Sequence, residues 1–349
     1  MRATIFSYVY RLIRFIVTKT LYFIQSILFI PKDLEPAVKI GDSVMSSISI
    51  IGKPFFDFKI PAKNQIELFE LKFPSPLIAA SFKSDYDILS IWMRMGLGSV
   101  TFKTIMKDIR FGNNRPRLQD ASLENEKGLL NSMGLPGPGI EKFKQTLSDI
   151  NLQEFNRPLG ISIGGDSASE YVYIITQIEN ALIENPYSYF YELNISCPNT
   201  VNGQTIGDNP NELELLLTQV REFTDKPISI KISPDLSNER LIEIGEICLE
   251  FDRILINTGN THYKKPSDVH VIPENFSMNA GGFSGPALFN RTLEMVKLFS
   301  QFNTPIIATG GISTIEHVRS LQSAGAILFG MATALVFDPY CIPKINYKL

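Results

Sequence analysis

A short segment near the middle of the chain combines side chains that are suited to chemistry. Residues 189–193 form an aromatic and apolar run of strand length, and the segment 194–200 (NISCPNT) follows it with two amides and the thiol of Cys197. The turn formers Pro198 and Gly203 predict that the strand ends in a loop. Free cysteine is often buried as a small hydrophobic residue. The polar neighbours on both sides of Cys197 favour a functional loop instead.

Two lysines stand at the ends of other predicted strands, and several amides accompany them. Lys103 and Lys231, without a cluster of metal ligands, suit a cofactor that accumulates negative charge, as a reduced flavin does. For each lysine the alternative is a solvated or ion-paired role. Amides can donate and accept hydrogen bonds at once, as a planar ring with carbonyl and N–H edges requires, although a single asparagine can equally form a turn. The amides are Asn131, Asn194, Asn199 and Asn257.

Glycines follow the last two predicted strands. One strand ends in Thr309-Gly310-Gly311, and the other leads through Gly330 to Ala332-Thr333. Glycine before a helix lets backbone N–H groups approach a phosphate. Gly-Gly also forms ordinary turns, but the last two strands of a barrel are the usual location of a phosphate site.

The elements that position these residues alternate between strand and helix. Eight strands are predicted at 77–80, 99–102, 159–163, 190–194, 228–232, 253–257, 306–308 and 326–329. Helices are predicted at 86–95, 140–150, 169–183, 212–223, 238–249, 291–302 and 314–323, with a short one after the last strand. Eight such units predict a (β/α)8 TIM barrel with its site at the carboxyl ends of the strands. A doubly wound open sheet is the alternative, but the first turn lacks G-x-G-x-x-G. The long connections 103–139 and 259–290 are expected to be functional.

The composition of the chain limits the classes of partner that it is expected to bind. The 349 residues are 44% hydrophobic and 20% charged with a net charge of −3, so no basic face for nucleic acid is predicted. The three cysteines lie far apart and the three histidines form no ligand motif, so neither a disulfide nor a metal site is predicted. The sequence leaves the oligomeric state open.

The first 32 residues differ from the rest because they contain five basic residues and no acidic one. Charges interrupt the apolar run, so the segment is too short to span a membrane. On a helix its polar residues share one stripe. These are Ser7, Arg11, Arg14, Thr18 and Gln25. We expect the helix to lie in a membrane interface, apolar side down, with its cations near anionic headgroups. A targeting segment and a helix packed on the protein's own core are the alternatives.

We expect residues 1–63 to form this helical extension and residues 64–349 the barrel. A second apolar segment at 44–51 would complete a passage from lipid to the cofactor, and residues 65–72 alternate as a half-buried strand or hairpin arm does. The expected location is peripheral membrane association on the cytoplasmic side.

Several motifs resemble the dihydroorotate dehydrogenase family. They are NISCPNT at 194–200, NSMGLP at 131–136, GNxxPR at 112–117, INT at 256–258, GGFSG at 281–285 and ATGGI at 308–312. The resemblance covers about residues 66–349 and implies a (β/α)8 barrel that binds FMN and oxidises dihydroorotate to orotate in pyrimidine (UMP) biosynthesis. A related dihydropyrimidine-type flavin reductase and a non-catalytic membrane-bound barrel are the alternative functions.

The resemblance also implies roles for individual residues. Cys197 would be the general base that removes the C5 proton of the substrate. The implied substrate-binding residues are Lys103, Asn131, Asn194, Asn199, Asn257 and Thr258. The implied FMN-binding residues are Ala80, Ser81, Lys103, Asn194, Lys231, Ser284, Gly285, Gly310, Gly311, Ala332 and Thr333.

The chain mixes features of two classes of this family. A cysteine base is typical of soluble members, which use fumarate or, through a partner subunit, NAD, whereas a hydrophobic extension is typical of membrane-associated members that use a quinone. Residues 79–83 (AASFK) depart from the membrane-class motif, and Ala332 replaces a usual glycine. The base takes part in the first half-reaction alone, so its identity does not determine the electron acceptor. The hydrophobic extension does bear on the acceptor, and it predicts a quinone. Fumarate or an NAD-linked partner is the alternative.

Overall fold

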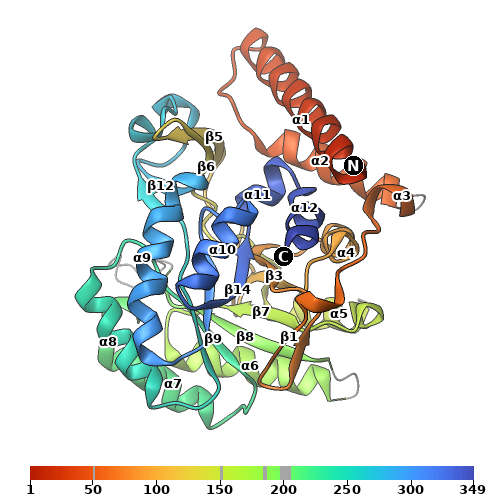
Figure 1. Ribbon diagram of the computed structural model, residues 1–349. Coiled ribbons are helices and arrows are strands. Elements are labelled where there is room, and N and C mark those ends of the chain that lie inside the picture. The colour runs from red at the N-terminus through yellow and green to blue at the C-terminus, as the bar shows by residue number, and fades with distance from the viewer. Residues whose placement is uncertain (50–51, 150–151, 184–186, 197–205) are drawn as a thin grey trace.

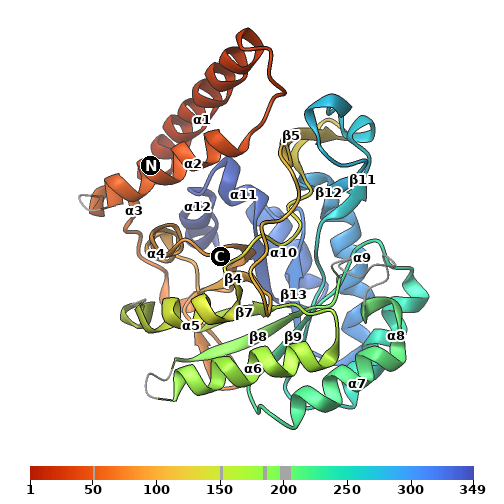
Figure 2. The ribbon, with the colours of Figure 1, turned by 180° about the vertical axis from the view of Figure 1, so that it is seen from behind.

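The computed structural model describes residues 1–49, 52–149, 152–183, 187–196 and 206–349. Eight parallel strands close into a barrel in the order β10-β13-β14-β3-β4-β7-β8-β9 (Figures 1 and 2). The strands are β3 (Leu77–Lys83), β4 (Ser99–Ile105), β7 (Leu159–Ile163), β8 (Tyr189–Asn194), β9 (Ile228–Lys231), β10 (Ile254–Asn257), β13 (Ile306–Thr309) and β14 (Ala326–Met331). The predicted TIM barrel is confirmed.

Helices follow the strands around the barrel. They are α4 (Tyr86–Met95), α5 (Gly139–Asp149), α6 (Ala168–Leu182), α7 (Pro210–Arg221), α8 (Asn238–Leu249), α9 (Phe289–Phe299), α10 (Ile315–Ser323), α11 (Thr333–Phe337) and α12 (Cys341–Lys348). The predicted helices 86–95 and 238–249 have the observed bounds, and the others differ by a few residues at their ends.

The two faces of β8 illustrate how the strand sequence builds the barrel. Side chains alternate between faces along a strand. Tyr189 and Tyr191 donate hydrogen bonds to the carboxylate of Glu179, on α6 outside the barrel. The residues between and after them, Phe190 and Glu192, are buried on the inner face. An apolar residue near the start of β8 and an acid near its end therefore face the barrel interior.

An apolar layer fills the amino end of the barrel interior. Inward residues of five barrel strands pack with two residues of a short antiparallel hairpin, β1 (Ile66–Leu68) and β2 (Leu71–Phe73). The cluster contains Leu71, Phe73, Ile78, Phe190, Leu255, Ile307 and Leu328. The hairpin agrees with the alternation predicted at 65–72 and packs on this end of the barrel. The polar residues further along each strand therefore lie toward the carboxyl end.

The two long connections form a second sheet beside the carboxyl end. It is antiparallel, in the order β11-β12-β6-β5. Its strands are β5 (Leu118–Leu123), β6 (Glu126–Asn131), β11 (His262–Lys264) and β12 (Gly281–Ser284). The sequence prediction missed these short strands. Strands β5 and β6 form a local hairpin, and β12 joins it by pairing residues more than a hundred positions apart, such as Phe283 with Leu130.

Three helices precede the barrel and pack beside α4 and α12, with the far end of α1 projecting away from the barrel (Figures 1 and 2). They are α1 (Arg2–Ile27), α2 (Glu35–Ser49) and α3 (Lys53–Phe56). The predicted polar stripe of α1 faces the protein, where Ser7, Thr18 and Gln25 are buried. Ser7 donates a hydrogen bond to Asp338, and the side chain of Gln25 bonds to the backbone of residue 33.

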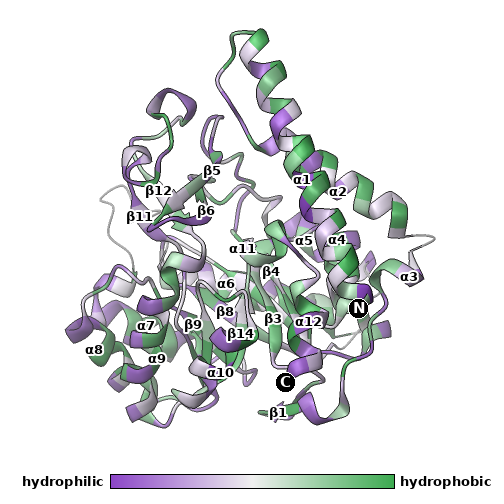
Figure 3. Ribbon diagram, turned by 45° about the horizontal axis from the view of Figure 1, so that its top comes forward, coloured by the Kyte–Doolittle hydropathy of each residue, from purple (hydrophilic) through white to green (hydrophobic). Residues whose placement is uncertain are grey.

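Most of the apolar side of α1 points outward. Leu12, Ile16 and Phe23 are 59%, 52% and 67% exposed, and hydrophobic residues run along the helix in Figure 3. Arg14 departs from the expectation that the cations of α1 face headgroups, because its guanidinium lies 2.5 Å from the carboxylate of Asp120 on β5. Within the described residues, no helix has the length and apolar character needed to cross a bilayer.

Candidate active site

A cavity of about 1580 Å³ opens at the carboxyl ends of the barrel strands. It continues from the barrel mouth to the extension, where Arg11, Phe15 and Val38 line it. A pocket for one small ligand usually measures about 300–1,000 Å³. This cavity therefore has room for a cofactor and a substrate together.

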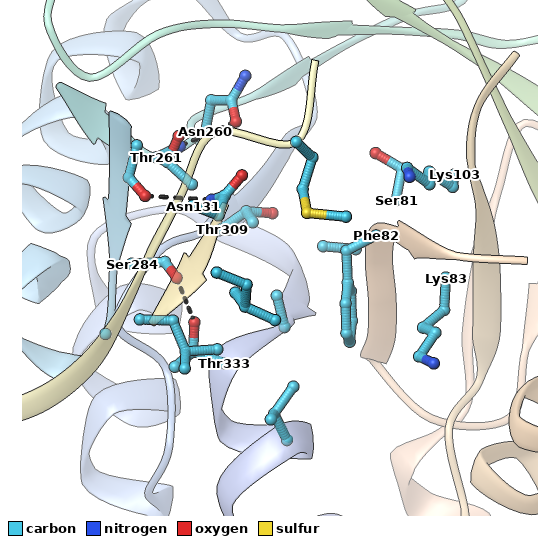
Figure 4. A pocket seen from close by; sticks show the side chains of 18 of the residues that line it. Ser81, Phe82, Lys83, Lys103, Asn131, Asn260, Thr261, Ser284, Thr309 and Thr333 are labelled. Atoms are coloured by element: carbon cyan, nitrogen blue, oxygen red, sulfur yellow. Dashed lines mark hydrogen bonds between the residues drawn. The ribbon is translucent and has the colours of Figure 1, made fainter. Parts of the chain in front are cut away.

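Most of the predicted site residues line this cavity. They are Ala80, Ser81, Lys103, Asn131, Asn194, Lys231, Ser284, Gly285, Gly310, Gly311, Ala332 and Thr333. Asn257 and Thr258 lie beneath its surface instead, only 2% and 0% exposed. Cys197 and Asn199 lie outside the described residues, directly after Ser196, which lines the cavity. Figure 4 shows Ser81 and Lys103 across the cavity from Asn131 and Asn260.

The two glycine turns build one wall. Gly311 has a φ of +71°, and a Cβ there would lie 2.5 Å from the backbone nitrogen of Phe289, at the start of α9. A side chain is therefore excluded on both counts. Beside this turn, Thr333 donates a hydrogen bond of 2.8 Å to Ser284 and joins β12 to the start of α11 (Figure 4). The wall therefore presents backbone groups without side chains, together with hydroxyl groups, and both suit the oxygens of a phosphate.

Lys231 belongs to a buried polar network on the barrel floor. Its ammonium donates a hydrogen bond of 2.9 Å to Ser81, which in turn donates to Glu192. Glu192 also accepts a hydrogen bond of 2.8 Å from Asn257. Lys231 Nζ lies 3.7 Å from Glu192 Oε1. The charge of Lys231 is therefore paired within the protein.

Lys103 is in a different electrostatic state. Burial lowers the pKa of Lys103 from 10.5 to about 8, and repulsion by Arg117 and Lys83 contributes. Among the described residues, no carboxylate lies within ion-pair distance of its ammonium. An anionic ligand in the cavity would relieve this cost.

The amides are held by neighbours on several elements. Asn131 donates a hydrogen bond of 3.1 Å to the carbonyl of Gly282, which leaves its own oxygen to accept. Asn194 donates a hydrogen bond of 3.0 Å to Thr104 and accepts one of 3.1 Å from Ser196. Ser196 in turn accepts a hydrogen bond of 2.7 Å from the side chain of Asn260. The residue before Cys197 is thus tied to the β10–β11 connection.

Three buried oxygens near these strand ends have no hydrogen-bond partner among the described residues. They are Asn257 Oδ1, Thr258 Oγ1 and Thr309 Oγ1. Buried polar groups are satisfied in most proteins. Together with the glycine wall and the unpaired Lys103, they fit a polar ring and a phosphate, so the chemistry of the donor set suits FMN and a cyclic substrate.

Two residues of the site were missed from the sequence. Glu192 could have been found, because an acid inside an otherwise apolar strand is rarely buried without a task. Asn260 had no comparable signal, since asparagine is common in loops.

The extension adds ion pairs at the outer end of the cavity. Lys83, at the end of β3, pairs with Asp42 of α2. Arg117 pairs with Glu35 at 2.7 Å. Phe82 stacks on Trp92 with ring centroids 5.3 Å apart. Polar contacts therefore fasten α1 and α2 beside the barrel mouth.

Comparison with known proteins gives consistent matches. Residues 64–349 match the family model described as dihydroorotate dehydrogenase. The catalytic subunit of dihydroorotate dehydrogenase B (NAD(+)) from Bacillus thuringiensis is 32% identical over 290 residues, 82% of this chain and 90% of the relative. Its counterpart from Bacillus mycoides is 33% identical over 289 residues, with the same coverage.

Solved structures show the same fold. The ligand-free DHODH of Eimeria tenella superposes with a TM-score of 0.75 at 19% identity, over 89% of this chain and 93% of that chain. The complex of that organism's DHODH with ferulenol superposes with a TM-score of 0.73 at 19% identity, over 88% of this chain and 89% of that chain.

Proposed function

Because the chain belongs to the dihydroorotate dehydrogenase family of FMN-dependent oxidoreductases, we propose that it oxidises dihydroorotate and passes the electrons to a quinone at a membrane surface. The oxidation follows from the family, and the acceptor is the new element. One observation carries it: α1 binds the protein through its polar stripe and exposes apolar side chains. In water, this arrangement leaves hydrophobic area unburied. In a membrane interface the same face is buried.

The residues that would hold FMN are those of the glycine wall and the floor. Gly310, Gly311 and Thr333 suit the phosphate, and Lys231 suits the electron-rich edge of the ring. When bound, FMN supplies a two-electron acceptor for the ring carbon of the substrate. The protein's contribution is to orient both rings and to exclude water from between them.

The substrate is an anionic ring with carbonyl and N–H edges, and two kinds of side chain suit it. The unpaired ammonium of Lys103 suits the carboxylate, and Asn131 and Asn194 suit the edges because each amide retains hydrogen-bonding capacity. Cys197, outside the described residues, is proposed to take the C5 proton as a general base.

The cavity supports a route for the second substrate. Its lining runs from Phe15 of α1 and Val38 of α2 past Phe82 to the floor residues Ser81 and Lys231. A lipid-dissolved oxidant can enter through such a passage between the two helices. A water-soluble oxidant has no need of it.

The experiment separates the extension from the chemistry. The full chain is compared with Leu12→Glu/Ile16→Glu, which charges the exposed side of α1, and with Leu215→Glu on α7, a control that is 51% exposed. Each is assayed for sedimentation with phosphatidylcholine–phosphatidylglycerol vesicles, for reduction of its flavin by dihydroorotate, and for turnover with a short-chain quinone, fumarate and NAD. We expect the double variant alone to lose vesicle binding, with flavin reduction unchanged.

The acceptor assays complete the test. Removal of residues 1–63 should abolish quinone turnover while flavin reduction by dihydroorotate survives. If the truncated chain reduces quinone equally well, or the intact chain prefers fumarate, the acceptor proposal is wrong and the dehydrogenase reaction stands.

A second acceptor has its own support. The Bacillus relatives are named as NAD(+)-type catalytic subunits, and Cys197 matches the soluble class. An NAD-linked route would require a partner flavoprotein. Turnover with NAD that appears only after a partner subunit is added would favour it.

A further inference from the structure

Glu192 is a buried acid to which no role has yet been assigned. It lies on β8, faces the barrel interior and is 2% exposed. A buried carboxylate is costly unless it is paired and hydrogen-bonded. The contacts of Glu192 therefore indicate what it is held for.

Those contacts reach three residues with predicted roles toward FMN or substrate. Oε1 accepts the hydroxyl of Ser81 and lies 3.7 Å from Lys231 Nζ. Oε2 accepts the amide N–H of Asn257 at 2.8 Å. Two hydrogen-bond donors and one cation therefore surround the carboxylate.

Both oxygens of the Glu192 carboxylate accept hydrogen bonds, and this fixes the direction of its neighbours. Asn257 must therefore turn its NH₂ group toward Glu192, and its oxygen does not take part in this contact. That oxygen is buried and without a partner in the described part of the chain. Ser81 donates its single proton to Glu192 and therefore accepts from Lys231.

Glu192 also sets the charge of the floor. Without it, the ammonium of Lys231 would be an uncompensated buried cation. A positive charge next to a flavin favours the reduced, negatively charged form. A compensated Lys231 keeps its hydrogen bonds while this bias is smaller.

We propose that Glu192 is a positioning residue that fixes the orientation of the Asn257 amide beneath the cavity surface and balances Lys231, so that the reduction potential of FMN stays low. This inference rests on the proposed dehydrogenase function. It assigns a role to an acid on the barrel floor that itself does not line the cavity.

The test uses the FMN-loaded full chain and Glu192→Gln, which keeps the shape and removes the charge. We expect the ratio of reduced to oxidised FMN at a fixed potential to rise about tenfold, which is about 30 mV for a two-electron couple. The dissociation constant of orotate, read from the flavin spectrum, should also rise about tenfold or more, because a glutamine no longer dictates the direction of the Asn257 amide.

Two further variants make the result specific. Glu192→Asp keeps the charge with a shorter reach, so the potential should stay near that of the wild type while orotate binding weakens. Glu179→Gln is the matched control, since Glu179 accepts hydrogen bonds from Tyr189, Tyr191 and Thr224 outside the barrel. It should change neither quantity.

The outcomes separate this inference from the proposed function. Bleaching of the wild-type flavin by dihydroorotate supports the reaction whatever the variants do. With that reaction intact, an unchanged or lowered potential in Glu192→Gln overturns the role of Glu192. If Glu192→Gln does not fold or retain FMN, unchanged orotate affinity in Glu192→Asp overturns it instead.

Discussion

Replacing Lys103 by methionine should stabilise the ligand-free protein and weaken its ligand binding. The pKa of Lys103 falls from 10.5 to about 8, mainly through burial. At 1.36 kcal/mol per pH unit, this fall corresponds to about 3 kcal/mol of native-state stability lost, as an upper value. Methionine has a similar length and no charge, so Lys103→Met should recover most of that amount.

The pH dependence gives the sign of the effect. Below pH 8 the lysine is protonated in both the native and the unfolded state, so the full cost is present. Between pH 8 and 10.5 the native state loses its proton first, and the stability of the wild type rises with pH. The advantage of Lys103→Met should therefore be largest at pH 7 and should shrink steadily as the pH approaches 10.5.

Urea unfolding of FMN-free protein at several pH values measures this difference. Lys297→Met, on the exposed side of α9, is the matched control and should change stability by less than about 0.5 kcal/mol. With saturating FMN and orotate the order should reverse, because the anionic ligands restore a partner to the lysine. A ligand-free Lys103→Met that is less stable than the wild type at pH 7, or an advantage that does not change with pH, would refute the reasoning.

Three further changes test other parts of the site. Cys197→Ala should retain FMN and slow flavin reduction by about 10²–10⁴-fold in stopped-flow absorbance, and equal rates would remove the thiol from the mechanism. Gly311→Ala should cost about 1–3 kcal/mol in urea unfolding and weaken FMN binding by fluorescence, because its φ is +71° and the Cβ would meet Phe289; unchanged FMN affinity would contradict a phosphate role for this turn. Arg14→Met removes the ion pair with Asp120 and should speed limited proteolysis of α1 without changing flavin reduction, whereas slower flavin reduction would show that α1 supports the chemistry itself.

The barrel could be predicted because its local signals agree with its global fold. Short apolar runs alternate with amphipathic segments, so strands such as 159–163 were located to the residue. The second sheet could not be predicted in this way. The pairing of β12 with β6 joins residues that are distant in sequence, and Gly281 and Gly282 have low strand propensity. Local propensity contains no information about such partners.

The sequence predicted which types of residue form the candidate site better than it predicted how deeply each residue is buried. Strand ends predicted that Lys103 and Lys231 reach the cavity, and both line it. The positions of Asn257 and Thr258 beneath the surface follow from the packing of neighbouring strands, which a single sequence does not record. The same holds for Glu192, whose role depends on cross-barrel contacts to Ser81 and Asn257.

The orientation of α1 bears most directly on the electron acceptor. A helical wheel separates polar from apolar residues but does not say which side meets the protein. In this chain the polar stripe does, through Ser7, Arg14 and Gln25, and the apolar residues beside it, such as Phe6 and Leu21, pack on the protein as well. For a helix packed in water the reverse arrangement would bury more apolar area and be more stable. In the proposed function, a membrane interface covers the apolar residues that α1 leaves exposed, such as Leu12, Ile16 and Phe23. An oxidant dissolved in that phase would then enter the same cavity that ends at Lys231, which joins the extension to the chemistry of the barrel through one continuous lining.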